Sequence, residues 1–206
     1  MPKIDHDTKE KILKAAEIVF HQNGFKGTRT TRIAEQAGIS RTMLHYYFST
    51  KEALFHEVLK NTLGTVVTHL RQLVVSSQNL HEVITTLVNV ISDLLDAKPH
   101  LPSFIVNIMN ETPELPLMLA SMEQDDLPAQ LNALLRREQE KGTVGMHVTG
   151  EDLMMHIYGI CALPYLTAPY IAAKEHRDAE AMQTLYNERR AKNVAFIMAG
   201  IRPIIA

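Results

Sequence analysis

Residues Thr30 to Lys51 read TTRIAEQAGISRTMLHYYFSTK, and this stretch contains two short helical patterns separated by a turn. The first pattern runs from about Thr31 to Ala37, with Ile33, Ala34 and Ala37 on its buried side. Gly38 follows directly, and glycine readily adopts the positive φ angle that ends a helix. The order of helix, glycine turn and helix predicts a helix-turn-helix.

The second helix of this stretch, from about Arg41 to Phe48, is expected to begin with Ser40 as its N-cap. Leu44 and Phe48 lie four residues apart, so both are expected to face inward. The side chains expected to face outward are Arg41, Thr42, His45 and Tyr46. A basic, hydroxyl-bearing and aromatic surface on so short a helix is suited to the major groove of DNA.

Composition indicates a soluble globular protein. The chain has 206 residues, 46% apolar and 21% charged, which suits one or two domains with a buried core. The single cysteine, Cys161, excludes an internal disulfide framework and is typical of a reducing compartment. The N-terminus lacks the apolar core of a signal peptide, so we expect a cytoplasmic location.

Charge is distributed unevenly along the chain. Residues 1–75 hold eleven Lys and Arg against seven Asp and Glu, a net charge of +4. The remaining residues hold ten against sixteen, a net charge of −6, and the two parts give the overall −2. A basic N-terminal part followed by an acidic remainder suits a protein whose N-terminal part, here called the head, binds DNA while the remainder does not.

Helical periodicity dominates the whole chain and predicts an all-α fold. Asn23-Gly24 is expected to end a first helix, and Ser49 with Glu52 forms a capping box for a helix reaching about Val75. The other expected helices cover about Leu80 to Ala97, Ser103 to Asn110, Pro128 to the stop at Gly142, Glu151 to Leu163, and Asp178 to Gly200.

Residues 153–173 contain no Asp, Glu, Lys or Arg. An uncharged stretch of this length can span a bilayer, or it can form a helix buried in a core or subunit interface. We favour burial, because Gly159, Pro164 and Pro169 interrupt the stretch and no other segment supports membrane insertion.

The chain resembles the TetR family of transcriptional regulators in three segments between Ile12 and Leu59, about a quarter of its length: ILKAAEIVFHQNGF, IAEQAGIS and LHYYFSTKEALF. The order of these pieces is far more specific than a bare helix-turn-helix pattern. The resemblance implies a DNA-binding domain over residues 1–50. It also implies a helical ligand-binding and dimerisation domain over residues 51–206.

Carried over by position, the resemblance implies base-edge contacts from Arg41, Thr42 and His45, and phosphate contacts from Thr30, Tyr46, Tyr47 and Lys51. Arginine can pair bidentately with guanine, whereas lysine and hydroxyl groups suit phosphate oxygens. Many relatives have glycine at position 42 and tyrosine at position 45, so the operator sequence is expected to differ. The structural alternatives are core packing for Tyr47, a solvated position for Lys51 and an ordinary surface position for His45.

Family members form homodimers through their last two long helices. The resemblance therefore implies a four-helix interface in which each copy supplies the apolar faces of these two helices. The residues on these faces are Leu153, Ile157, Ile160 and Cys161 in the first helix, and Leu185, Val194, Ile197 and Met198 in the second. A pocket for an apolar effector is expected among the middle helices, lined by Phe104, Ile108, Met109, Met118, Met122, Met154, Met155, His156 and Tyr158. The alternative for each of these residues is plain core packing, with His156 a hydrogen-bonded core or interface histidine.

The predicted function is a ligand-responsive transcriptional repressor that binds a palindromic operator as a homodimer. The alternatives are a helical partner-binding protein or a constitutive DNA-binding protein without an effector. Catalysis is not expected: His56-Glu57 and His81-Glu82 lack a second histidine, no phosphate-binding or nucleophile motif occurs, and Cys161 lies in an apolar run. No cofactor or metal is expected.

Overall fold

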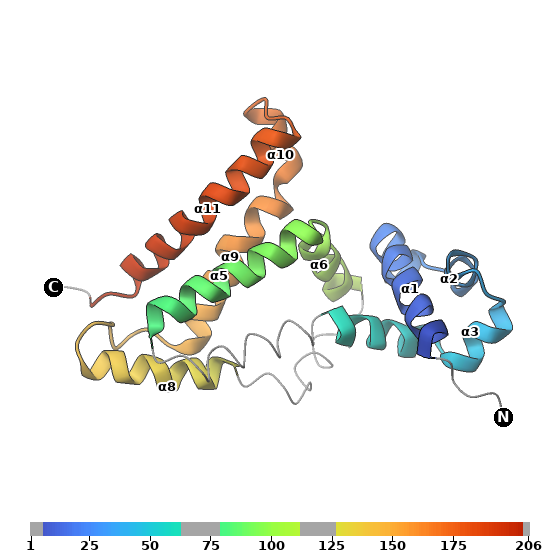
Figure 1. Ribbon diagram of the computed structural model, residues 1–206, viewed down its shortest axis with the longest axis horizontal. Helices are drawn as coiled ribbons and strands as arrows, with labels where there is room; N and C mark the ends of the chain where they lie inside the picture. Colours follow the sequence, from blue (N-terminus) through green and yellow to red (C-terminus); the bar gives the residue numbers. More distant parts are fainter. Residues whose placement is uncertain (1–5, 63–78, 112–126, 204–206) are drawn as a thin grey trace. The chain divides into compact units, whose positions relative to one another are not determined.

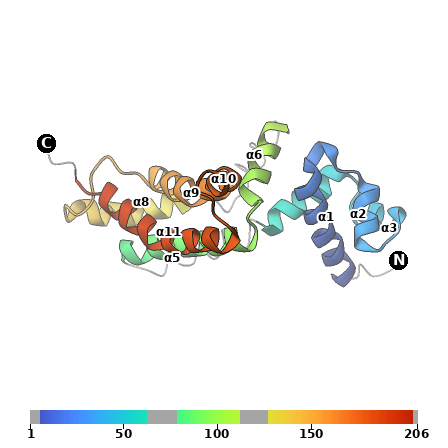
Figure 2. The same cartoon turned by 90° about the horizontal axis from the view of Figure 1, so that it is seen from above.

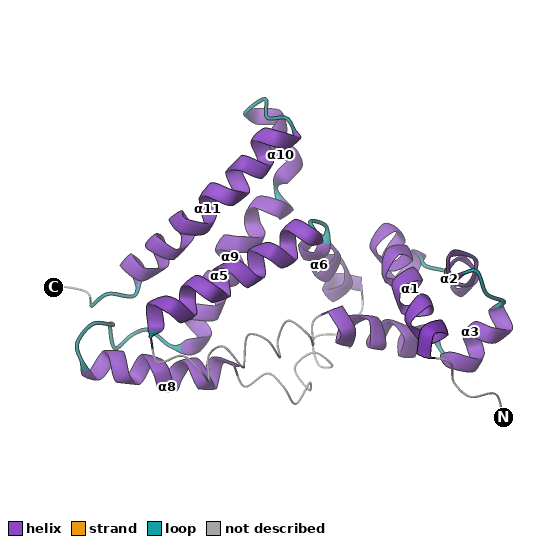
Figure 3. Ribbon diagram, in the orientation of Figure 1, coloured by secondary structure: helices purple, strands orange, loops and turns teal. Residues whose placement is uncertain are grey.

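Helices form all the regular secondary structure in the computed structural model, which describes residues 6–62, 79–111 and 127–203 (Figure 3). The predicted all-α fold is therefore confirmed. The described residues fall into two compact units. Residues 6–62 and 103–111 make up the first unit, and residues 79–102 and 127–203 make up the second.

The first unit begins with α1 (His6–Gly27) (Figure 1). This helix buries one apolar stripe, which includes Ile12, Ala15, Ala16, Val19 and Phe20. The expected stop at Asn23-Gly24 is a local break: Gly24 has φ 66° and ψ 178°, and the helix assignment resumes as far as Gly27. The hydroxyl of Thr28, which is buried, donates to the Gly24 carbonyl at 2.7 Å. Glycine permits the positive φ angle here, and Thr28 satisfies a carbonyl that the break leaves without its helical partner.

The first unit also contains α2 (Thr30–Ala37), α3 (Arg41–Tyr47) and the helical residues 51–62. The cap of the last helix is Thr50, whose hydroxyl accepts from the Ala53 amide at 3.0 Å. The predicted cap, Ser49, is therefore one residue too early. The predicted continuation of this helix to Val75 lies outside the described residues.

An aromatic cluster holds the first unit together and involves residues on both sides of the predicted domain boundary at residue 50. The ring of Phe55 lies 4.8 Å from the ring centroids of both Phe20 and Phe25. Phe104 of α6 (Leu101–Glu111) lies 6.1 Å from Phe55 and 4.2 Å from His21. Because the contacts of Phe55 with the rings of α1 are aromatic and largely buried, residues 51–62 pack with α1 as part of the first unit. The boundary drawn after residue 50 lies inside the first unit.

The second unit contains α5 (Leu80–Ala97), α8 (Leu127–Glu140), α9 (Gly150–Leu166), α10 (Ala168–Lys174) and α11 (Ala179–Gly200). Helix α11 packs on α5 and α9, and α8 packs on α9 and α5 (Figures 1 and 2). Side-chain caps fix the helix starts at Asn79, at Thr149 with Asp152 as a capping box, and at Asp178. The helix predicted over Leu80 to Ala97 is confirmed at both ends.

Residues 164–169, which follow the helix predicted to end at Leu163, are largely helical. Pro164 lies in the last turns of α9, where its missing N–H removes a single helical hydrogen bond. Pro169 lies in the first turn of α10, where no intrahelical donor is required. The chain changes direction only at Thr167, so α10 is an element that the sequence prediction missed.

Tyr165, Asp96 and Arg190 connect α9, α5 and α11 through hydrogen bonds. The Tyr165 hydroxyl donates to Asp96 Oδ1 at 2.5 Å, and Arg190 donates to Asp96 Oδ2 at 2.7 Å. Burial alone would raise the pKa of Asp96, but hydrogen bonds from Tyr165 and Arg190 outweigh it and hold that pKa below its ordinary value. Burial and the neighbouring Asp96 raise the pKa of Tyr165, so it remains a protonated donor.

We expect Tyr165→Phe to lower the free energy of unfolding by about 1–3 kcal/mol at neutral pH, because a buried hydrogen bond to a charged group is lost. Folding depresses the pKa of Asp96, so its stabilising contribution is present at neutral pH and is lost as pH falls below about 4. The difference between wild type and variant should therefore shrink in acid. Urea unfolding measures it, with the exposed Tyr170→Phe as the matched control.

Candidate nucleic-acid interface

The turn between α2 and α3 is built as the sequence predicts. Gly38 has φ 67°, and its amide together with that of Ile39 donates to the Glu35 and Ala34 carbonyls at 3.1 and 3.0 Å. Ser40 then accepts from the Met43 amide at 3.1 Å as the N-cap of α3. These bonds satisfy the last carbonyls of one helix and an early amide of the next, so the angle between the two helices is fixed locally.

Helix α3 has one buried and one exposed face. Leu44 and the C-cap residue Phe48 are buried, at 1% and 6% exposure, as predicted. The residues expected at base edges, Arg41, Thr42 and His45, are all exposed. The structure therefore brings these three side chains to one solvent-facing surface of a seven-residue helix.

The side chains expected at phosphates are more varied in their surroundings. Thr30 is half-buried at the start of α2, and Tyr46 is 53% exposed. Tyr47 is half-buried, with its ring edge-on to Tyr46 at 5.5 Å between centroids. Two exposed arginines that the sequence reasoning omitted, Arg29 and Arg32, flank Thr30 and add positive charge next to it.

Lys51 has intramolecular contacts that the sequence did not reveal. Its ammonium donates to the carbonyls of Phe25 at 2.9 Å and Thr28 at 3.2 Å, and lies 4.4 Å from the Phe25 ring centroid. A lysine ammonium has three N–H donors, so a third donor stays available for a phosphate oxygen. In this arrangement Lys51 stabilises the end of α1, and its phosphate contact stays a prediction.

We expect Lys51→Met to lower the free energy of unfolding by about 1–2 kcal/mol, because two carbonyl contacts and a cation–π contact are lost while the apolar stem is kept. If Lys51 also contacts phosphate, the slope of log K against log salt should fall by about one. Chemical unfolding and salt titrations of DNA binding separate the two effects. Lys60→Met, at an exposed position in the same helix, is the control.

The residues predicted to line an effector pocket lie in different surroundings. Phe104 is buried against His21 and Phe55, and Met109 is 41% exposed; both belong to the first unit. On α9, Met154 is buried in the core of the second unit, whereas Met155, His156 and Tyr158 are exposed. Met118 and Met122 lie outside the described residues, and the side chain of Ile108 is not described.

The predicted dimer contacts are partly wrong, because several of these side chains form the chain's own core. Leu153, Ile157 and Cys161 of α9 pack with Val194 and Ile197 of α11 and with α5. Burial raises the pKa of the Cys161 thiol, as expected for a structural cysteine. Ile160, Leu185 and Met198 are half-buried. A different set of apolar side chains remains exposed on these helices: Met155, Tyr158, Leu163 and Leu166 on α9, and Phe196 on α11.

In the described part of the chain, no helix is both long enough and apolar enough to cross a membrane. The uncharged stretch starting at residue 153 instead supplies Leu153, Ile157, Cys161 and Tyr165 to the core of the second unit. The prediction that this stretch is buried is correct for one face of α9.

Residues 12–58 match the family described as "Bacterial regulatory proteins, tetR family". The chain is 54% identical over 55 residues to the HTH-type transcriptional regulator RutR of Escherichia coli K12, a match that spans about a quarter of either protein, 27% of this chain and 26% of RutR. It is 25% identical over 174 residues to the probable HTH-type transcriptional regulator YttP of Bacillus subtilis, covering 80% of each chain.

Among solved structures, the fold is similar to FadR from Bacillus subtilis, crystallised in complex with stearoyl-CoA. The TM-score is 0.70 at 18% identity, over 94% of this chain and 99% of FadR. This likeness concerns the fold, whereas the match over residues 12–58 concerns the sequence of the head. The comparisons therefore show a DNA-binding head of the type found in bacterial regulators of the tetR family over residues 12–58, and a similarity of fold over the rest of the chain.

Proposed function

We propose that this chain binds operator DNA as a two-fold homodimer and represses transcription until a small apolar molecule releases it. The observation that carries the proposal is the exposed surface of α3, where Arg41, Thr42 and His45 project from a helix fixed by its Gly38 turn and Ser40 cap. Rigid presentation of arginine to base edges is the usual basis of sequence readout.

Dimerisation is supported by an exposed apolar stripe on α9. Met155, Gly159, Leu163 and Leu166 recur at helical spacing on the side of α9 turned away from the core. Met155 and Leu163 are each 58% exposed, so two large apolar side chains of this stripe face solvent in the single chain. Gly159 has no side chain and open space beside it, so it permits close approach of a second helix. With Phe196 of α11, 68% exposed, this stripe suits the same stripe on a second copy.

The nature of the effector is proposed by analogy with the solved relative. FadR binds stearoyl-CoA, a molecule with a long apolar chain, and shares the fold of this protein. A ligand releases DNA only if it binds the DNA-free conformation more tightly, and tenfold weaker operator binding requires about 1.4 kcal/mol of coupling. DNA must then weaken the ligand by the same factor. The alternatives are a constitutive DNA-binding protein without an effector and a helical partner-binding protein.

Selection of bound sequences from random duplex DNA tests the proposal. The expected product is a palindromic or pseudo-palindromic site with half-sites about one helical turn or more apart, roughly 34 Å. Binding should weaken steeply with salt. A monomer that ignores duplex DNA at low salt would rule out the operator-binding role and leave the partner-binding alternative.

A further inference from the structure

A cavity of about 730 Å³ lies at one end of the second unit, lined by residues from the start of α5, the end of α8 and the end of α11. This volume is within the range of small-molecule sites. None of its lining residues belongs to the predicted effector pocket of the middle helices. It is therefore a separate location within the second unit.

The inner wall of the cavity is apolar. Leu80, Val144 and Ile201 are nearly fully buried, with 4% of each side chain exposed, and Met198 beside them is half-buried. These residues come from α5, from the loop after α8, from α11 and from the residue that follows it, so three parts of the chain hold the wall in place. Such a wall favours an apolar ligand body.

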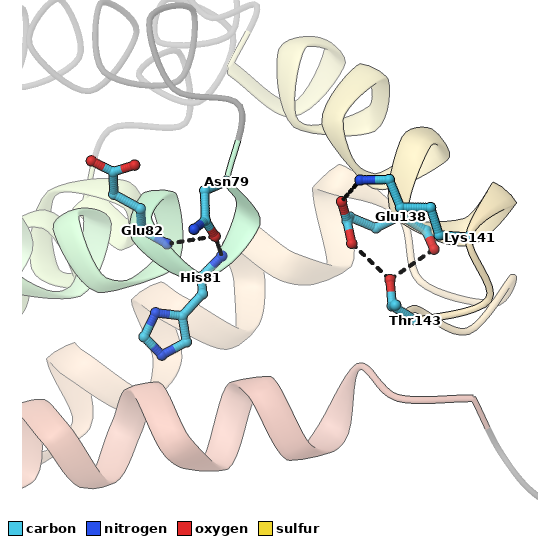
Figure 4. A network of polar contacts seen from close by, with 6 residues as sticks. All are labelled: Asn79, His81, Glu82, Glu138, Lys141 and Thr143. Atoms are coloured by element: carbon cyan, nitrogen blue, oxygen red, sulfur yellow. Dashed lines mark hydrogen bonds and ion pairs between the residues drawn. The ribbon is translucent and has the colours of Figure 1, made fainter.

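The rim of the cavity carries two cations, Lys141 and Arg202, and the imidazole of His81, and all three side chains are exposed. The one carboxylate in the lining, Glu138, is already neutralised: it accepts from Lys141 Nζ at 2.6 Å and from the Thr143 hydroxyl at 2.7 Å (Figure 4). Within the described residues, the Arg202 guanidinium has no ion-pair or hydrogen-bond partner. This positive rim contrasts with the acidic remainder of the chain after residue 75, where ten Lys and Arg face sixteen Asp and Glu.

Two amides at the start of α5, those of His81 and Glu82, are not available to bind an anion, because they already donate to the Asn79 side chain. Asn79 Oδ1 accepts from the His81 and Glu82 amides at 3.0 and 3.4 Å (Figure 4). Recognition of a negative charge therefore falls to the side chain of Arg202, because Lys141 beside it is already paired with Glu138. The imidazole of His81 extends toward α11, and Glu82 points away from it.

From this combination of an apolar wall and a cationic rim, we propose that the cavity binds a small amphipathic carboxylate. Its apolar body lies against Val144, Met198 and Ile201, and its carboxylate pairs with Arg202, with Lys141 beside it. A neutral analogue of the same shape keeps the apolar contacts and loses the ion pair. An amine of the same shape is repelled by the rim.

Methyl NMR of the full-length protein tests the site without DNA, so its outcome is independent of the proposed function. The protein is labelled at its methionine methyl groups and titrated separately with octanoate, octanol and octylamine. We expect a saturable shift of the Met198 signal with octanoate, at least threefold weaker binding of octanol, and no saturable shift with octylamine. Met198→Leu assigns the signal, and Met154, in the core, serves as the internal reference.

Matched variants identify the recognition groups. Arg202→Gln should weaken octanoate binding by about three- to fivefold, the upper part of the range of an exposed ion pair, and leave octanol binding unchanged. Arg136→Gln, an exposed arginine of α8 outside the lining, should change neither. Equal Met198 shifts with octanoate and octanol, an unmoved Met198, or equal effects of the two arginine variants would each overturn the proposal.

Discussion

Leu163→Arg should convert the proposed dimer to a monomer and weaken operator binding by more than 100-fold. Leu163 is 58% exposed in the middle of the apolar stripe on α9. In a two-fold interface the substitution occurs in both copies, so two like charges enter the same contact without partners. An uncompensated buried charge costs several kcal/mol, and a 100-fold loss of affinity corresponds to about 2.7 kcal/mol.

Light scattering after size-exclusion chromatography measures the mass of the variant, and fluorescence anisotropy on the selected operator measures its affinity. Met146→Arg places the same charge at an apolar residue that is 80% exposed in the loop between α8 and α9, so it should leave both quantities unchanged. A Leu163→Arg protein that stays dimeric and binds the operator normally would show that this stripe is not the dimer interface.

Arg41→Ala should weaken binding to the selected operator by at least about 30-fold and relax the preference at one base position of each half-site. A bidentate arginine–guanine pair contributes about 1–3 kcal/mol of discrimination, and a palindromic site contains two of them. The exposed position of Arg41 in the first turn of α3 means that its removal costs the fold little.

Arg32→Ala provides the comparison, because Arg32 is an exposed arginine of α2 on the same head. If it neutralises phosphate, its loss weakens all sequences alike and lowers the salt slope by about one. Repeating the selection with both variants distinguishes the two roles. Loss of affinity without any change in base preference in Arg41→Ala would contradict base readout by this residue.

The sequence predicted the head well because its determinants are local. Gly38 and Ser40 act on amides and carbonyls within five residues of themselves, so a short window contains the whole signal. Thr50 and Ser49 are adjacent hydroxyl residues of similar capping strength, which explains the one-residue error there. The Lys51 contacts were not predictable, because Phe25 and Thr28 lie 26 and 23 positions away in the chain.

It was harder to predict from the sequence which side of α9 faces the core, because this helix has no charged face after its first turn. Without charged residues from 153 to 166, periodicity cannot decide which apolar side faces the core. The adjacent residues Met154 and Met155 illustrate this: one is 5% exposed and the other 58%. The sequence could show that α9 is apolar, but only tertiary packing assigns Ile157 and Cys161 to the core and Leu163 to the surface.

The aromatic cluster around Phe55 has a practical consequence for building hybrid regulators. A graft that exchanges only residues 1–50 would keep Phe20 and Phe25 from one parent and take Phe55 and Phe104 from the other. Side chains in such a cluster fit one another closely, so mismatched parents would leave voids or overlaps beneath the head. A transplantable reading module of this protein must therefore include the helical residues 51–62 and match its recipient at position 104.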